Sequence, residues 1–164
     1  MGLLQPDGRG RRLFRRDALT AEAPLIVIHS LAHAVAALSA AAEAGRPVTL
    51  LSAPDAGISA GPGWFGALVA AARAAVPSAR NAMLLDCGDD AGAAQAAIRA
   101  GIEGVVFTGR PDVAERLADI AAQARVTLVT ARPVPALDLG AQFFAAPEFL
   151  RRRVTDVLAS RQAV

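Results

Sequence analysis

The chain repeats one pattern, in which a short aliphatic run ends in small or polar residues and an alanine-rich stretch with helical character follows. The aliphatic runs are continuous rather than alternating, which is typical of strands buried on both faces, as parallel strands are. Strands that alternate with helices predict right-handed crossovers and a parallel sheet. We expect strands at residues 25–29, 48–52, 82–86, 104–108 and 126–130.

Capping and stop signals place the helices between these strands. Ser30 can cap a helix that Gly45 ends, and Asp89 or Asp90 can cap a helix that ends at residue 100. Pro111 suits the first turn of a helix, because its missing N–H would have no partner there. Apart from the helix that ends at residue 100, we expect helices at residues 31–44, 64–76, 111–124 and 147–160.

The predicted fold class is α/β, with about five parallel strands that alternate with helices. Five such units can form part of a (β/α)8 barrel, or they can lie open as a doubly wound sheet with helices on both faces. The pattern alone does not separate a partial TIM-barrel-like sheet from an open doubly wound one. A length of 164 residues suits one domain, which we place at residues 21–164 after an arginine-rich tail at residues 1–20.

Composition indicates whether a membrane partner is expected and in which cellular compartment the protein is expected to work. Hydrophobic residues make up 54% of the chain, yet no uninterrupted apolar stretch reaches the roughly 20 residues of a membrane helix, so we expect no membrane partner. No apolar signal-peptide core follows the N-terminal arginines. The single cysteine, Cys87, excludes an intrachain disulfide and suits a reducing compartment, which predicts a cytoplasmic location.

The positive charges of the chain are all arginines, and the formal net charge is only +2. They gather near the two ends, at residues 9–16 and 151–153, and no nucleic-acid motif follows them. Such basic ends are more often solvated than bound to phosphates. A nucleic-acid partner is therefore not expected.

Polar residues next to the predicted core gather where strands end, which is where parallel α/β folds place their functional groups. Asp86 could act as a general acid or base if burial raised its pKa, and Cys87 could be a nucleophile or ligand if deprotonated. The alternative is that Cys87 is a small buried apolar residue. His29 is a further candidate, while its pairing with His33 as a zinc site lacks a third ligand nearby, so no metal or cofactor is expected.

Two other strand ends suit a small anion. Ser52 at the end of the second strand is a candidate ligand-binding residue. The loop rich in Gly and Pro that follows it contains Gly61 and Gly63, whose backbone N–H groups could approach an anion at a helix N-terminus. The alternative is a plain turn, with Trp64 and Phe65 packing inward. Beyond the fourth strand, a hydroxyl, a flexible backbone and a cation suit a phosphate or carboxylate, at Thr108, Gly109 and Arg110; Arg110 could equally be a surface residue before a helix.

Several short motifs together resemble the N-terminal half of class II, metal-dependent fructose-bisphosphate aldolases. An Ala-Glu pair at 42–43 precedes Pro-Val-Thr-Leu-Leu-Ser at 47–52, where the family has a strand that begins Pro-Val-Ile. Leu-Asp-Cys-Gly at 85–88 stands for the family's Leu-Asp-His-Gly. Ala-Ile and Ala-Gly within 97–101 match a family helix, and Val-Val-Phe-Thr-Gly at 105–109 matches Val-Met-Phe-Asp-Gly.

The resemblance implies the first units of a (β/α)8 barrel, with Asp86 in the place of the family's catalytic carboxylate. It also implies that Cys87 replaces a metal-binding histidine. The family's other metal ligands and phosphate loops come from later strands, and no histidine follows residue 109 here. We therefore expect a truncated and degenerate relative in which aldolase activity is absent.

Three functions fit these observations. The first is a non-catalytic domain that binds a small anionic metabolite at the strand ends, with Gly61, Gly63 and Arg110 meeting the anion. The second is a small lyase or isomerase that uses Asp86 as a base, with Cys87 or His29 assisting. The third is a homo-oligomeric interaction protein, most simply a homodimer, in which another copy covers the open sheet edge and the alanine-rich helices.

Overall fold

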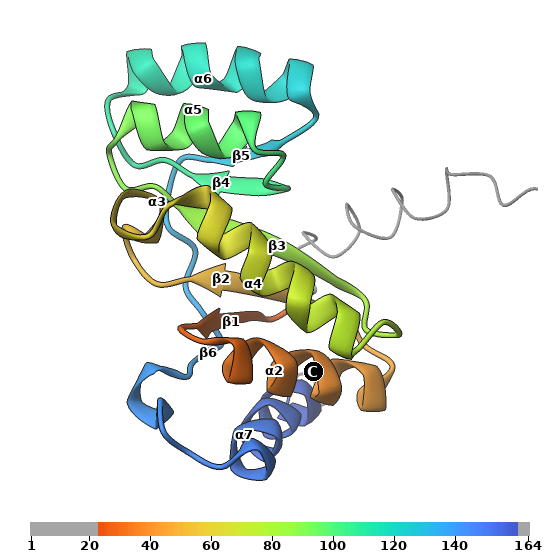
Figure 1. Cartoon of the computed structure of the whole chain (residues 1–164). Coiled ribbons are helices and arrows are strands. Elements are labelled where there is room, and N and C mark those ends of the chain that lie inside the picture. Colours follow the sequence, from red (N-terminus) through yellow and green to blue (C-terminus); the bar gives the residue numbers. More distant parts are fainter. Residues whose placement is uncertain (1–22, 161–164) are drawn as a thin grey trace, which may run out of the picture.

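The computed structural model describes residues 23–160, which form a six-stranded, fully parallel sheet (Figure 1). The strand order is β5-β4-β3-β2-β1-β6. Five strands follow the sequence pattern, each starting and ending within two residues of its predicted position. Their bounds, with the sixth, are Leu25–Ile28 (β1), Val48–Ser52 (β2), Asn81–Asp86 (β3), Gly104–Val106 (β4), Thr127–Val129 (β5) and Leu137–Asp138 (β6).

The helices also agree closely with the predicted pattern, and local capping explains most of their bounds. Ser30 Oγ accepts the backbone N–H of His33 at the start of α2, and Gly45 ends that helix in the left-handed conformation. Asp90, rather than Asp89, caps α5 by accepting the N–H of Ala93. The helices are Leu31–Ala44 (α2), Ala56–Ser59 (α3), Gly61–Ala75 (α4), Ala91–Arg99 (α5), Pro111–Ala124 (α6) and Pro147–Ser160 (α7), with a 3-10 turn at Gly140–Gln142 (η1).

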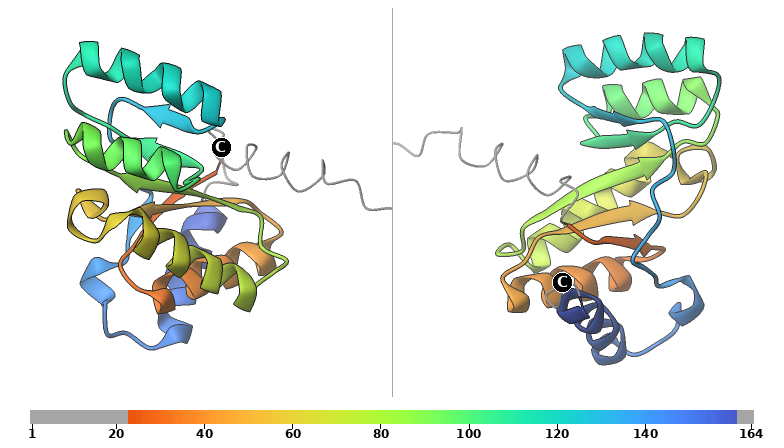
Figure 2. Two further views of the ribbon diagram at one scale, coloured as in Figure 1. Left: turned by 45° about the horizontal axis from the view of Figure 1, so that its top comes forward. Right: turned by 180° about the vertical axis from the view of Figure 1, so that it is seen from behind.

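The larger helices lie on one face of the sheet, as the view from behind makes plain (Figure 2). A strand order that steps from β1 to β5 through right-handed crossovers places every crossover helix on the same side. The buried side chains agree, because one cluster joins alternate strand residues to helices while a second contains strand residues only. The second cluster consists of Val27, Leu51, Leu84 and Val106, with Leu25 and Val129 packed against it. Within residues 23–160, the open sheet has the strand order from β1 to β5 and the one-sided helices of part of a barrel rather than those of a doubly wound sheet.

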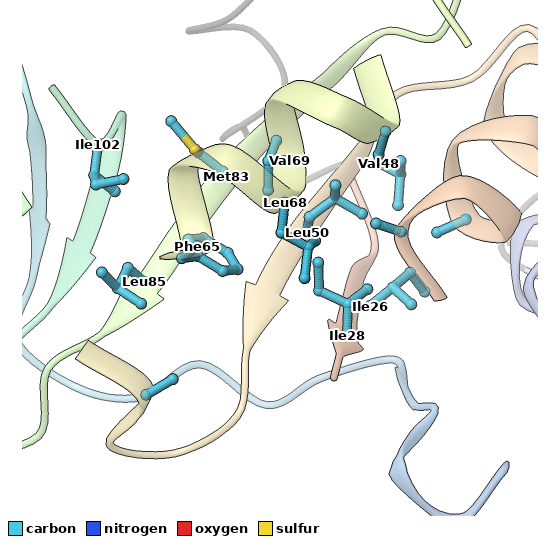
Figure 3. Close-up of a cluster of buried hydrophobic side chains, with 14 of the residues drawn as sticks. Ile26, Ile28, Val48, Leu50, Phe65, Leu68, Val69, Met83, Leu85 and Ile102 are labelled. Carbon is cyan, nitrogen blue, oxygen red and sulfur yellow. The ribbon is translucent and has the colours of Figure 1, made fainter. Parts of the chain in front are cut away.

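The main core lies between the sheet and this helical layer (Figure 3). Strand residues such as Ile26, Leu50 and Leu85 meet Phe65 and Val69 of α4, and all five are fully buried. Phe65 therefore packs inward as expected. The same expectation for Trp64 is wrong, because α4 begins at Gly61 and its turn places Trp64 on the outer surface, where it is 44% exposed.

The segment between β5 and β6 crosses from one edge of the sheet to the other, beside the carboxyl ends of the strands (Figure 2). Its prolines leave it without a helix, and β6 then pairs with β1 through Ile26–Leu137 and Val27–Asp138. This crossing segment, residues 130–136, therefore runs past the strand ends.

Within residues 23–160, no helix has the length and apolar character that crossing a bilayer requires. The predicted boundary between tail and domain at residues 20 and 21 lies outside the described residues, as does the arginine cluster at residues 9–16. Both stay predictions.

Candidate functional site

The centre of the carboxyl edge is Asp86, the last residue of β3, whose side chain is only 4% exposed. Its Oδ1 atom accepts the backbone N–H of Gly88 at 2.8 Å and that of Asp55 at 3.3 Å. Its backbone N–H donates to Ser52 Oγ at 2.9 Å, which ties the ends of β2 and β3 together. The turn after β2, which contains Asp55, and the turn after β3, which contains Gly88, are therefore both hydrogen-bonded to one buried carboxylate.

Arg132, in the crossing segment, contacts both Asp86 and Ser52. Its Nη1 atom donates to Asp86 Oδ2, and its Nη2 atom donates to the carbonyl oxygen of Ser52 at 2.9 Å. The guanidinium, 24% exposed, thus holds residues 130–136 against the ends of β2 and β3. A planar fork with five N–H donors suits such a bridge. No residue within 23–160 accepts a hydrogen bond from its Nε–H.

A second polar pair lies at the ends of β1 and β6. His29 Nε2 lies 2.7 Å from Asp138 Oδ1, which also accepts the backbone N–H of Gly140 at 2.8 Å. Burial raises the pKa of Asp138, but the Gly140 N–H and His29 outweigh it, with a smaller contribution from Arg132, and the net shift is downward. Arg132 therefore acts electrostatically on both polar groups.

Cys87 lies directly after Asp86 and is fully buried beneath α3. Burial, with the nearby charges of Asp86 and Asp90, raises the pKa of its thiol to about 12. A thiol that stays protonated at neutral pH is a poor nucleophile and a poor metal ligand. Its burial and raised pKa favour the alternative interpretation, in which Cys87 is a small buried residue.

A metal site does not fit these residues. No group of three or more His, Cys, Asp or Glu side chains within residues 23–160 is arranged to hold a metal ion. Cys87, which stands in the place of a histidine ligand in the aldolase-like motif, is protonated and enclosed. We derive no chemical step through a metal.

Apart from Ser52, no residue that was predicted to bind an anion makes a hydrogen bond with the side chain of Asp86 or of Arg132. Gly61 and Gly63 belong to the first turn of α4 rather than to a loop, and a Cβ on either would meet nothing within 4 Å. Thr108 is exposed, and Arg110, 79% exposed at its side chain, pairs with Asp112. Gly109 is enclosed by the ring of Phe107.

Of the predicted residues, the structure brings together Ser52, Asp86 and Cys87, while His29 belongs to the neighbouring pair. Arg132 and Asp138 were not chosen as site residues, although Arg132 follows the fifth strand, one of the strand ends where functional groups were expected. Both lie in a segment without hydrophobic periodicity, so no pattern showed that it returns to the strand ends. The available signal was a charged residue directly after the fifth strand and before Pro133.

Comparison with known proteins supports the fold. No protein-family model matches the chain, and no curated protein matches it. Among solved structures, the chain is similar to a protein described as a candidate fructose-1,6-biphosphate aldolase from Coccidioides immitis, with 17% identity and a TM-score of 0.55. The match covers 71% of this chain but 42% of that protein, so the chain spans less than half of its length. At this identity the likeness shows an aldolase-like α/β fold and not an activity.

Proposed function

We propose that this chain is a non-catalytic binding domain, which takes a small anionic metabolite at the carboxyl edge of its aldolase-like sheet. The observation that carries the proposal is the position of Arg132. Its guanidinium lies among the strand ends, bridged to Asp86 and Ser52, with its Nε–H edge free for a ligand.

Binding fits Asp86 better than proton transfer does. A general base needs a carboxylate oxygen that can reach the substrate. Here Oδ1 accepts two backbone N–H groups and Oδ2 accepts Arg132, so the carboxylate is committed to the protein. The alternative of a small lyase or isomerase would require Arg132 to leave Asp86 first.

An anion is favoured over a cation by the surroundings of Arg132. Each helix that follows a strand starts at this edge, and helix N-termini carry partial positive charge. Asp86 and Asp138 are each paired already, with Arg132 and His29. A carboxylate or phosphate can therefore meet the outer edge of the Arg132 guanidinium without displacing either pair.

The test is thermal unfolding of the protein with inorganic phosphate, sugar phosphates and dicarboxylates, with neutral sugars as the matched negative panel. A ligand at about 100 times its dissociation constant adds roughly 2.7 kcal/mol, which raises the midpoint by several degrees. We expect this rise with at least one anion and its loss in Arg132→Gln.

Arg110→Gln serves as the comparison, because Arg110 also follows a strand but is exposed and paired with Asp112. Loss of the rise in Arg110→Gln alone would move the site to the end of β4. No rise with any anion would overturn the proposal.

A second candidate, self-association, is favoured by the outer face of α4. The one charged residue of this helix, Arg73, turns inward and pairs with both carboxylate oxygens of Glu103, at 2.9 and 3.0 Å. A surface helix usually carries a polar outer face, and one that does not is usually covered. The exposed residues of α4 are Gly63, Trp64, Ala67, Ala70, Ala71, Ala74 and Ala75.

Sedimentation at micromolar concentration tests self-association. We expect a dimer that Ala70→Glu on α4 dissociates and that Ala122→Glu, at an exposed position of α6, leaves intact. A monomer at all concentrations would rule this candidate out and leave the binding domain untouched.

A further inference from the structure

His33 is a fully buried histidine in the first turns of α2, and the residues around η1 cover it. The ring of Phe143, just after η1, packs edge-on against the His33 ring, with centroids 5.6 Å apart. The His29 ring contacts it from the end of β1, at 6.0 Å. His33 therefore joins α2 to the segment that leads from β6 into α7.

The hydrogen bonding of His33 fixes its neutral tautomer. Its Nδ1 atom accepts the backbone N–H of His29 at 3.2 Å, so the ring proton of the neutral form lies on Nε2. Nε2 makes no hydrogen bond of good geometry, although the backbone carbonyls of Gln142 and Phe143 lie close enough to favour the protonated ring. Within residues 23–160, the other buried side-chain atom without such a hydrogen bond is Oε1 of Gln142, in the same covering segment. Unsatisfied buried groups cost free energy, so these two atoms weaken the contact between α2 and the covering segment.

The charges near His33 come from two strand ends. Burial lowers the pKa of His33 below 6.5, and His29 lowers it further, while backbone carbonyls of Gln142 and Phe143 and the carboxylate of Asp138 oppose the shift. Asp138 is already bonded to His29 and to Gly140 N–H. No charged group of α4 or α7, the described helices packed on α2, is among those that shift it.

We propose that His33 is an acid-sensitive latch, which holds residues 139–146 against α2 while its ring is neutral and releases them when it is protonated. Protonation places a hydrogen on Nδ1, where the His29 N–H now donates, and leaves an imidazolium buried without a bonded carboxylate. Because residue 138 precedes this segment, its release would loosen Asp138 at the edge where Arg132 lies.

The direction in which pH changes the stability of the latched form follows from the neutral state of the His33 ring in that form. A histidine that is harder to protonate in the latched form stabilises that form fully above its unfolded pKa, near 6.5. As the pH falls below that value, the stabilisation is progressively lost. The latch is therefore closed at neutral pH and opens under mild acid.

Hydrogen exchange with mass spectrometry, corrected for the intrinsic effect of pH, tests the latch in the full chain. The amides of Gln142 and Ala145 report on it, since they donate within the segment to Leu139 and Gln142 carbonyls at 2.9 and 3.0 Å. From about pH 7.5 to about pH 5.5, we expect protection of residues 139–146 to fall by about tenfold while β2 and β3 stay protected.

Two variants distinguish the effect of His33 on the pH dependence from that of His29. His33→Gln removes the titrating ring and is expected to abolish the pH effect, while His29→Gln keeps the backbone N–H and is expected to preserve it. An unchanged wild-type segment, an equal loss in His33→Gln, or dependence on His29 alone would each overturn the proposal. Should His33→Gln fail to fold, the ¹⁵N shifts of His33 in the wild type decide, because a ring that does not titrate over the same pH range cannot be the latch.

Discussion

At the scale of single residues, burial explains why two strand-end candidates differ from their expected chemistry. Asp86 and Cys87 are adjacent, and the sequence correctly places both at the end of β3. Sequence does not show what surrounds them after folding. Two backbone N–H groups and Arg132 engage the carboxylate, and α3 encloses the thiol, because three separate segments return to this strand end.

The Cys87 thiol is expected to resist alkylation. Its pKa is raised to about 12, so at about pH 8 almost none of it is thiolate, which is the reactive form. Iodoacetamide should label the folded protein far more slowly than the same protein in urea, where the thiol is free. Labelling of the folded chain at the rate of the unfolded one would contradict the enclosed position of Cys87.

At the scale of elements, prediction succeeded where the hydrophobic periodicity and the capping and helix-ending residues indicate the same bounds. The helix at residues 31–44 was predicted with its bounds because Ser30 and Gly45 mark its two ends. The four-residue α3 and the two-residue β6 were not predicted, since neither is long enough to show a period. Both are formed by tertiary contacts: α3 packs on Cys87, and β6 pairs with β1.

The packing of α3 predicts a selective effect of adding one methyl group. A Cβ on Gly57 would lie 2.5 Å from Cys87 Sγ and 3.0 Å from the Asp86 carbonyl oxygen. We expect Gly57→Ala to lower the free energy of unfolding by about 1–3 kcal/mol, measured by urea denaturation. Cys87→Ala in the same chain should restore part of that loss.

Gly63→Ala is the matched control, since a Cβ at this position of α4 meets nothing within 4 Å. Alanine favours a helix over glycine by about 1 kcal/mol, so this variant should be as stable as the wild type or more stable. Equal losses in both variants would show that α3 does not lie against Cys87.

At the scale of the whole molecule, the larger helices lie on one face of the sheet, and the crossing segment runs past its carboxyl edge (Figure 1). The α/β class and the carboxyl edge as the place of polar groups were predictable from alternating strands and helices. The half of the site that Arg132 and Asp138 supply was not. Those residues reach the edge only because residues 130–136 cross the entire sheet, and such a long-range return leaves no periodic trace in the sequence.

The account depends most on the bridge from Arg132 to Asp86, and a double-mutant cycle of unfolding free energies measures it directly. Breaking a buried pair leaves the other charge unpaired, so Asp86→Asn and Arg132→Met should each destabilise the fold, by roughly 2 kcal/mol or more. The exposed pair Arg110 and Asp112 gives a matched cycle, with an expected coupling below about 0.5 kcal/mol. For Asp86 and Arg132 we predict a coupling of at least about 1.5 kcal/mol, whereas effects that add within about 0.5 kcal/mol would show that the crossing segment is not anchored at the strand ends.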